Sequence, residues 1–433
     1  MATKHTIDII TLGCSKNLVD SERLMRELSR IGWHCTHDAE VPRADVAVIN
    51  TCGFIGDAKQ ESIQTILQMA ARKSAGKLRR LYVMGCLSER YLKELESEIP
   101  EVDRWFGKFD FMGLVEELSG VIAQHDVERV LTTPIHYAYL KISEGCNRFC
   151  SYCAIPLITG RHTSRPIEEL VSETEWLVKQ GVKEINIIAQ DLSSYGLDLY
   201  GEHKLPELIE TLASISGVEW LRLHYAYPAD FPMELLDVMA RHKNICKYLD
   251  LALQHSTNHM LGLMRRHITA EQQDQLIATI RERVPGIVIR TTLLVGHPRE
   301  TEEDFKELLS WTRRMHFERL GAFAYSDEEG TYAHRHYKDD IPEDIKQQRR
   351  AQIMAVQQEI AEQWSANMIG KKLTIIVDRE EDGYWIGRTE YDSPEVDCEV
   401  LVKQTPSSAV QIGAFIQVKI THSEAFDLYA EIC

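Results

Sequence analysis

Apolar positions in the first third of the chain alternate between short continuous runs and helical stripes. Residues 6–12, 45–50 and 81–84 form apolar runs with the length of a buried strand. The segments between them, residues 18–31 and 57–71, carry apolar side chains at helical spacing. Because strands that alternate with helices are typical of a doubly wound parallel sheet, the sequence predicts an α/β domain of that class at the amino terminus.

The middle of the chain repeats this alternation, with helical stripes such as residues 167–180 and 232–241. Apolar runs predict strands at residues 137–142, 184–189, 220–224, 248–253, 287–295 and 319–325. Six strand–helix units predict a partial (β/α)6 barrel. By the logic of complete barrels, reactive groups then belong at the carboxyl ends of the strands.

The apolar period changes again in the last third. Residues 342–368 predict one long helix, and short runs typical of strands follow at residues 373–378, 384–390, 399–403, 415–420 and 428–432. Five such strands favour a small barrel of the OB type, a class that binds oligonucleotides. We place domains at residues 5–121, 132–363 and 366–433, with a polar linker at 121–134.

Charge and composition narrow the function. The 433-residue chain has a net charge of −17, so its overall field does not attract nucleic acid. From Lys371 onward there are six basic and twelve acidic residues, a balance of −6, which favours a basic protein partner over RNA. The sequence contains no apolar run near the ~18 residues of a membrane span and no evident signal peptide. We expect a cytoplasmic protein without a membrane partner, whose ten cysteines serve as reduced thiols or metal ligands.

Three of these cysteines lie within eight residues, directly after the run at 137–142. Cys146, Cys150 and Cys153 have the spacing Cys-x3-Cys-x2-Cys. Thiolates select zinc, copper(I) or iron–sulfur clusters, and structural zinc takes four ligands, whereas His162 is the single nearby histidine. A 4Fe–4S cluster takes one Cys per iron, so three ligands would leave one iron open for chemistry. A structural zinc knuckle is the alternative.

Three further cysteines follow the three amino-terminal strands by one or two residues. Cys14, Cys52 and Cys86 therefore come together at one edge of the predicted sheet, where ligands bind in such folds. We expect a second three-thiolate cluster there, although ordinary buried cysteines would show the same residues. We interpret the remaining cysteines as structural: Cys35, Cys246, Cys398 and Cys433.

The Cys146 loop resembles the signature of radical S-adenosylmethionine (radical SAM) enzymes. The resemblance implies that the open iron binds SAM, that one electron then generates a deoxyadenosyl radical, and that Tyr152 lies near the adenine. Stretches that resemble the family also nominate Gln190, Asp191 and Gln254 as cofactor-binding residues. Family members often have Gly-Phe-Pro-Gly-Glu where this chain has residues 296–300, GHPRE, a departure that puts a role for this loop in doubt. Arg265 and Arg266, in a stretch that also resembles the family, are interpreted as a solvated cationic face rather than as catalytic residues; contact with an acidic substrate or with the SAM carboxylate is the alternative.

The amino-terminal motifs resemble the methylthiotransferase family. They are TLGCSKNLVDSE at residues 11–22, NTCGFI at 50–55 and MGCLSERY at 84–91. The Ser15-Lys16-Asn17 variant is similar to the RimO branch, since the tRNA branch usually has Gln-Met-Asn there. The resemblance implies two 4Fe–4S clusters, a second one that carries sulfur, and a carboxyl-terminal TRAM domain. It also implies methylthiolation of the β-carbon of an aspartate in small-subunit ribosomal protein S-twelve, with an electron donor such as flavodoxin.

Other functions remain open at this point. A tRNA adenosine methylthiotransferase would share every cluster feature, although the charge of the last domain argues against tRNA as substrate. A non-enzymatic, metal-dependent RNA-binding protein would need no iron, and a radical SAM enzyme could carry a merely structural second cluster. We assign no catalytic residue beyond the six cluster ligands.

Overall fold

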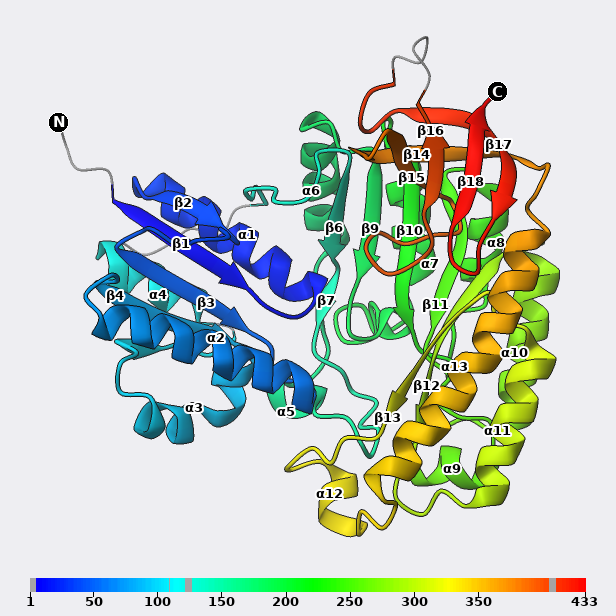
Figure 1. Ribbon diagram of the computed structural model, residues 1–433, viewed down its shortest axis with the longest axis horizontal. Helices are drawn as coiled ribbons and strands as arrows, with labels where there is room; N and C mark the ends of the chain where they lie inside the picture. The colour runs from blue at the N-terminus through cyan, green and yellow to red at the C-terminus, as the bar shows by residue number, and fades with distance from the viewer. Residues whose placement is uncertain (1–4, 109, 121–126, 405–409) are drawn as a thin grey trace.

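The computed structural model describes residues 5–108, 110–120, 127–404 and 410–433. Figure 1 shows three units in chain order: an amino-terminal α/β sheet, a central open barrel and a small closed β-barrel. This architecture confirms the predicted fold class. The first part of the predicted linker, residues 121–126, lies outside the described residues. Every helix in the described part of the chain is too short or too polar to cross a membrane.

The amino-terminal sheet has five parallel strands in the order β2-β1-β3-β4-β5. The elements of this unit are β1 (Thr6–Thr11), α1 (Ser15–Arg30), β2 (His34–His37), β3 (Val46–Thr51), α2 (Gly56–Ser74), β4 (Arg80–Gly85), α3 (Cys86–Glu98), β5 (Arg104–Trp105) and α4 (Phe111–Ser119). The predicted strands are the adjacent β1, β3 and β4. The apolar pattern does not reveal β2 and β5, because β2 is short and polar and β5 has only two residues.

The central barrel has six parallel strands in the order β13-β12-β11-β10-β9-β6, with β6 and β13 as its open edges. Its strands are β6 (Tyr137–Lys141), β9 (Glu184–Ile188), β10 (Trp220–Ala226), β11 (Ile245–Leu251), β12 (Val288–Val295) and β13 (Arg319–Ala324). Its longer helices are α6 (Ile167–Lys179), α7 (Leu205–Ala213), α8 (Glu234–Arg241), α10 (Ala270–Arg283) and α11 (Glu302–Met315). The shorter elements are β7 (Ser143–Glu144), α5 (Ile155–Thr159), β8 (Thr163–Ser164), the 3-10 turn η1 (Leu192–Ser194), α9 (Asn258–Leu263) and α12 (Tyr332–His336). All six strands match predicted runs.

Helix α13 (Glu343–Ala366) follows Pro342 and packs on α11 and β13 before it leads to the small barrel. That barrel closes in the order β14-β15-β16-β18-β17. Its strands are β14 (Lys372–Glu381), β15 (Tyr384–Thr389), β16 (Val400–Lys403), β17 (Phe415–Ser423) and β18 (Leu428–Ile432). The five predicted strands are therefore confirmed.

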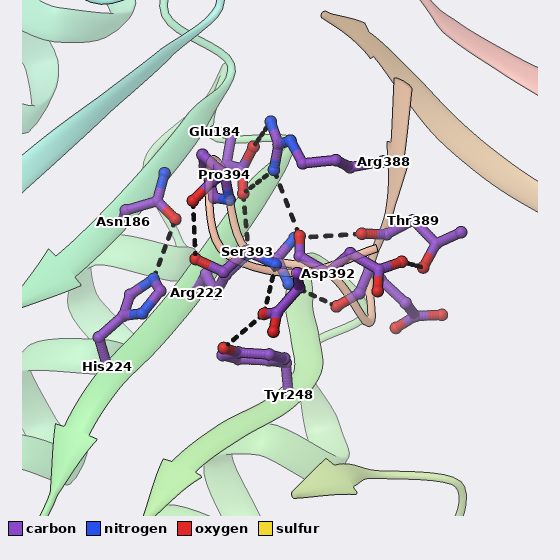
Figure 2. A network of polar contacts seen from close by, with 12 residues as sticks. Glu184, Asn186, Arg222, His224, Tyr248, Arg388, Thr389, Asp392, Ser393 and Pro394 are labelled. Atoms are coloured by element: carbon purple, nitrogen blue, oxygen red, sulfur yellow. Dashed lines mark hydrogen bonds and ion pairs between the residues drawn. The ribbon is translucent and has the colours of Figure 1, made fainter. Parts of the chain in front are cut away.

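The small barrel docks at the amino-terminal mouth of the open barrel through buried charges, which Figure 2 shows from close by. Glu184, the first residue of β9, accepts a hydrogen bond from Arg222 Nε at 2.8 Å and one from Arg388 Nη2 of β15 at 2.7 Å. Burial by itself would raise the pKa of Glu184, but the charges of Arg388 and Arg222 hold it below the usual value. The carboxylate therefore stays ionised between two guanidinium groups.

The loop between β15 and β16 extends this contact. Arg319, the first residue of β13, pairs with Asp392 at 2.6 Å, and the Tyr248 hydroxyl donates to Asp397 at 2.8 Å. Because Glu184 and Arg319 each begin a barrel strand, this loop covers the amino-terminal mouth and leaves the carboxyl ends of the strands free.

We predict that Glu184→Gln destabilises the docked barrels. Removing one partner of a buried ion pair leaves charge without compensation and costs about 3–5 kcal/mol. Unfolding followed by circular dichroism should show a clearly lower midpoint. Glu210→Gln is the control, because the Glu210–Arg241 pair lies on the surface and should leave the midpoint unchanged. Equal midpoints for the two variants would contradict this account of the interface.

Candidate functional site

The three amino-terminal cysteines lie together at the carboxyl edge of the first sheet. Cys14 follows β1, Cys52 follows β3 and Cys86 follows β4, and these strands are parallel neighbours. A Cβ atom at Gly13 would lie 2.9 Å from the Cys52 sulfur, so Cys52 packs directly on the backbone beside Cys14. Burial first, and then the thiols of Cys14 and Cys52, raise the pKa of Cys86 to about 12. The structure thus brings the three predicted thiols to one place.

Asn17 links the loops that carry these thiols. Its side-chain amide donates to the carbonyl of Leu12 at 2.9 Å and to that of Thr51 at 3.1 Å. Its oxygen accepts from the Cys86 thiol at 3.6 Å. One buried side chain therefore holds all three strand ends in register.

Two glycines permit the close approach of these loops. Gly85 has a φ of 103°, and a Cβ there would lie 2.6 Å from the Thr51 carbonyl oxygen. A Cβ at Gly53 would lie 2.7 Å from the Cα of Leu87. Any larger residue at these positions would push the thiols apart, because backbone atoms cannot yield like the end of a flexible side chain.

The second set of thiols lies on the loop after β7. Gly145 has a φ of 79°, and a Cβ there would clash with the Arg161 carbonyl. The start of the loop therefore packs against the backbone of the segment that follows α5. The Arg148 amide donates to the Cys146 sulfur at 3.5 Å, and the Cys153 amide donates to the Cys150 carbonyl at 3.1 Å. Burial, followed by the charge of Asp191, raises the pKa of Cys146 to about 12.

Arg266 is a site residue that the sequence analysis missed. The interpretation of Arg266 as solvated is wrong: it is 2% exposed, and its Nη1 donates to the Cys150 sulfur at 3.3 Å and to the Tyr152 hydroxyl at 3.4 Å. Its guanidinium also lies 4.1 Å from the centre of the Tyr227 ring. The apolar residues Met260, Leu261, Leu263 and Met264 precede it, but the charge of a side chain in an Arg-Arg pair favours a solvated interpretation.

The flanking residues adopt an uncommon backbone conformation. Arg265 and His267 both have positive φ values, 57° and 54°, and Arg265 packs over the Tyr332 ring at 4.6 Å. These left-handed positions reverse the chain around Arg266 and leave its side chain beneath the thiol loop.

The residues nominated for cofactor binding lie at the carboxyl ends of the barrel strands. Asp191 is buried and already accepts hydrogen bonds from Arg148 Nε at 2.7 Å and from the Ser193 amide at 2.9 Å, so it fixes the thiol loop. Gln190 donates to Glu144, while its buried oxygen has no hydrogen-bond partner among the described residues. Gln254 follows β11 with a φ of 73°. Its backbone amide donates a hydrogen bond to the Thr292 carbonyl at 2.8 Å.

The loop that departs from the family pattern nevertheless contacts the thiol loop. His297 is buried, and its Nε2 lies 3.0 Å from the Ser151 hydroxyl. Burial lowers the pKa of His297 to about 4, so the ring is neutral at physiological pH. The neutral ring also packs edge-on against the Tyr152 ring and so supports it.

A largely buried group of charges lies between α1 and the short strand β7 that leads into the second set of thiols. Lys108 Nζ lies 3.3 Å from Asp20 of α1 and 3.7 Å from Glu144 of β7, and Lys141 bridges the same two carboxylates. The charge of Lys108 opposes the rise in the pKa of Cys86, so this ammonium lies near the first set. Glu144 lies two residues before Cys146 in the chain, so the group extends from the first set to the strand that leads into the second.

The donor atoms and their surroundings fit a bulky soft ligand at each set. Among the described residues, no group of three His, Cys, Asp or Glu side chains is placed to hold a single metal ion. Zinc would need sulfur atoms at about 2.3 Å from one centre. A 4Fe–4S cluster instead spreads its thiolates over separate irons, which suits three thiols on separate loops in the first set and three spaced thiols on one loop in the second.

We predict that Gly85→Ala reduces iron binding. The added Cβ would lie 2.5 Å from Asn50 Oδ1 and would displace Cys86, so the iron content of anaerobically reconstituted protein should fall clearly below that of the wild type. Gly76→Ala is the matched control, because Gly76 also has a positive φ, 72°, but nothing lies within 4 Å of the added atom. Equal iron content in the two variants would contradict the role assigned to the Cys86 loop.

A known protein family matches each of the three units. The family model described as "Uncharacterized protein family UPF0004" matches residues 6–107, the radical SAM superfamily matches 140–312 and the TRAM domain matches 369–433. Among solved structures, the radical SAM methyltransferase TsrM from Kitasatospora setae has a TM-score of 0.55 at 15% identity, over 73% of this chain and 72% of that one. The cobalamin-dependent enzyme OxsB has a TM-score of 0.53 at 11% identity, over 82% of this chain and 56% of that one. These likenesses show the fold.

Curated relatives match over nearly the whole length. The "Ribosomal protein uS12 methylthiotransferase RimO" of Phocaeicola vulgatus is 59% identical over 99% of both chains. Proteins of the same name from Porphyromonas gingivalis W83 and Cytophaga hutchinsonii are 56% and 48% identical, over 99% of this chain and 99% and 98% of theirs. With such identity across all three units, the chain belongs to the RimO family of radical SAM methylthiotransferases.

Proposed function

We propose that this chain attaches a methylthio group to the β-carbon of an aspartate in ribosomal protein uS12. The proposal rests on one observation above all: two sets of three thiols lie beyond strand carboxyl ends in adjoining units, and Lys108 pairs with a carboxylate from each of these units. The names of the full-length relatives support the choice of substrate. We place the domains at residues 5–121, 132–363 and 366–433, the protein in the cytoplasm, and an electron donor such as flavodoxin as its partner.

Each set of thiols is assigned one 4Fe–4S cluster. Cys146, Cys150 and Cys153 would hold the one that binds SAM, and Cys14, Cys52 and Cys86 would hold the other. Bound at these thiolates, the clusters would supply one-electron cleavage of SAM and a store of sulfur. An unactivated C–H bond calls for this radical chemistry, because no protein base can remove such a proton.

The side chains of the barrel prepare the SAM site. Arg266 places a positive charge on Cys150 and restrains the Tyr152 hydroxyl, which we assign to the adenine end of SAM. Asp191 orients the Cys146 loop through Arg148, and the free oxygen of Gln190 is available to accept a hydrogen bond from SAM. Gln254 follows β11, two strands away from β9 in the same sheet, and we assign it to the same ligand.

The small barrel favours a protein substrate over tRNA. Two of its six basic residues are committed to carboxylates: Arg388 is buried against Glu184, and Arg379 pairs with Glu399 at 2.5 Å. Phosphate binding needs free lysines and arginines, so the surface is poorer in them than the sequence count indicates.

The direct test is the intact mass of uS12 after anaerobic incubation with reconstituted enzyme, SAM, a reductant and sulfide. We expect the mass to rise by one methylthio group in place of one hydrogen, and tRNA treated in the same way to stay unchanged. Methylthiolated adenosine with unmodified uS12 would refute the proposal.

We further predict that Cys52→Ala separates the two half-reactions. The Cys146 set is untouched, so SAM should still be cleaved to 5′-deoxyadenosine, whereas methylthiolated uS12 should fall below detection. Cys35→Ala is the control, because Cys35 lies within edge strand β2 rather than at the carboxyl end of a central strand. Product formed by Cys52→Ala at the wild-type rate would mean that the second cluster is merely structural.

A further inference from the structure

Lys16 is a buried cation at the junction between the amino-terminal sheet and the barrel. It lies in the first turn of α1, two residues after Cys14, and only 8% of it is exposed. Its Nζ lies 3.6 Å from the centre of the Tyr225 ring, which belongs to the carboxyl-terminal end of β10. Figure 1 shows the start of α1 beside the strands of the barrel.

Among the described residues, Lys16 has no carboxylate within 4.0 Å and no hydrogen-bond acceptor. The other buried lysines are paired: Lys108 lies 3.3 Å from Asp20, Lys141 lies 2.8 Å from Glu144 and Lys346 lies 2.6 Å from Asp339. Burial of an ammonium is unfavourable unless a partner compensates its charge, and a π-face compensates it only in part. Lys16 therefore lacks an anion.

Asp250 is the carboxylate near Lys16, and it already has other partners. Asp250 has Arg290 Nη1 at 3.8 Å and accepts from the Tyr225 amide at 3.4 Å. Burial, and then the charges of Arg222, Arg290 and Lys16, hold the pKa of His224 well below its usual value, so this ring adds no positive charge of its own. Among the described groups that surround Tyr225, Arg290 is paired with Asp250 and Arg222 with Glu184, so an incoming anion would find Lys16 without a carboxylate.

We propose that Lys16 binds the side-chain carboxylate of the aspartate that is modified. This inference rests on the proposed function and names the specificity element of the same site. Tyr225 is 36% exposed, so part of the ring against which the ammonium lies is open to solvent. A carboxylate held there keeps the adjoining β-carbon one bond away, beside the loop that carries Cys14.

The test is a double-mutant cycle on binding. Reconstituted wild type, Lys16→Met and Lys16→Arg are each titrated with labelled uS12 and with uS12 whose target aspartate is asparagine, and fluorescence anisotropy gives the Kd. A charge-assisted hydrogen bond predicts that Lys16→Met weakens binding of the aspartate form about tenfold to a hundredfold, with Lys16→Arg close to wild type. Binding of the asparagine form should be the same in wild type and Lys16→Met.

Controls distinguish the alternatives. Lys93→Met removes an exposed lysine of α3 and should change neither Kd. An equal loss for the aspartate and asparagine forms would overturn the proposal, as would a raised Kd for SAM with unchanged uS12 binding, which would assign Lys16 to the carboxylate of SAM. If Lys16→Met loses its iron, the wild-type enzyme still tests the proposal. It must bind the asparagine form of uS12 more weakly than the aspartate form. Failure of the proposed function is a separate outcome, in which wild type binds uS12 but never methylthiolates it.

Discussion

The close approach of three strand ends in the amino-terminal sheet is the constraint on which the site depends. Parallel strands bring Cys14, Cys52 and Cys86 to one edge, but the thiols meet only because glycine backbones at Gly53 and Gly85 admit neighbouring chain at contact distance. Asn17 then ties the three loops together. The backbone geometry of the strand ends, rather than any interaction between the thiols, therefore brings the three cysteines together.

The small barrel closes one end of the central barrel and leaves the other end open to the amino-terminal sheet. Buried ion pairs of Glu184 and Arg319 fix the small barrel at the amino-terminal mouth and cover it. The carboxyl-terminal mouth stays free to face the first sheet across Lys108, Asp20 and Glu144. The TRAM unit is in this way part of the architecture of the barrel, whatever further contacts its surface makes.

The positions of charged residues were the least accessible to sequence reasoning. Arg266 and Arg388 look like surface residues in the sequence, yet both are buried, one against a cysteine and one against a glutamate from another domain. Periodicity cannot reveal such partners, because they lie more than a hundred residues away along the chain. Lys16 belongs with them: its isolation is visible only once the barrel is placed beside α1.

The sequence by itself determined the three units, their strands and the six thiols with their glycines, because apolar period and motif spacing are local properties. The short edge strands β2 and β5 escaped it, since a few polar residues carry no period. Only the tertiary structure decided which charges are buried and which of them are paired. Those outcomes depend on how separate domains pack, and the free energy of a buried charge is set by neighbours that the local sequence does not contain.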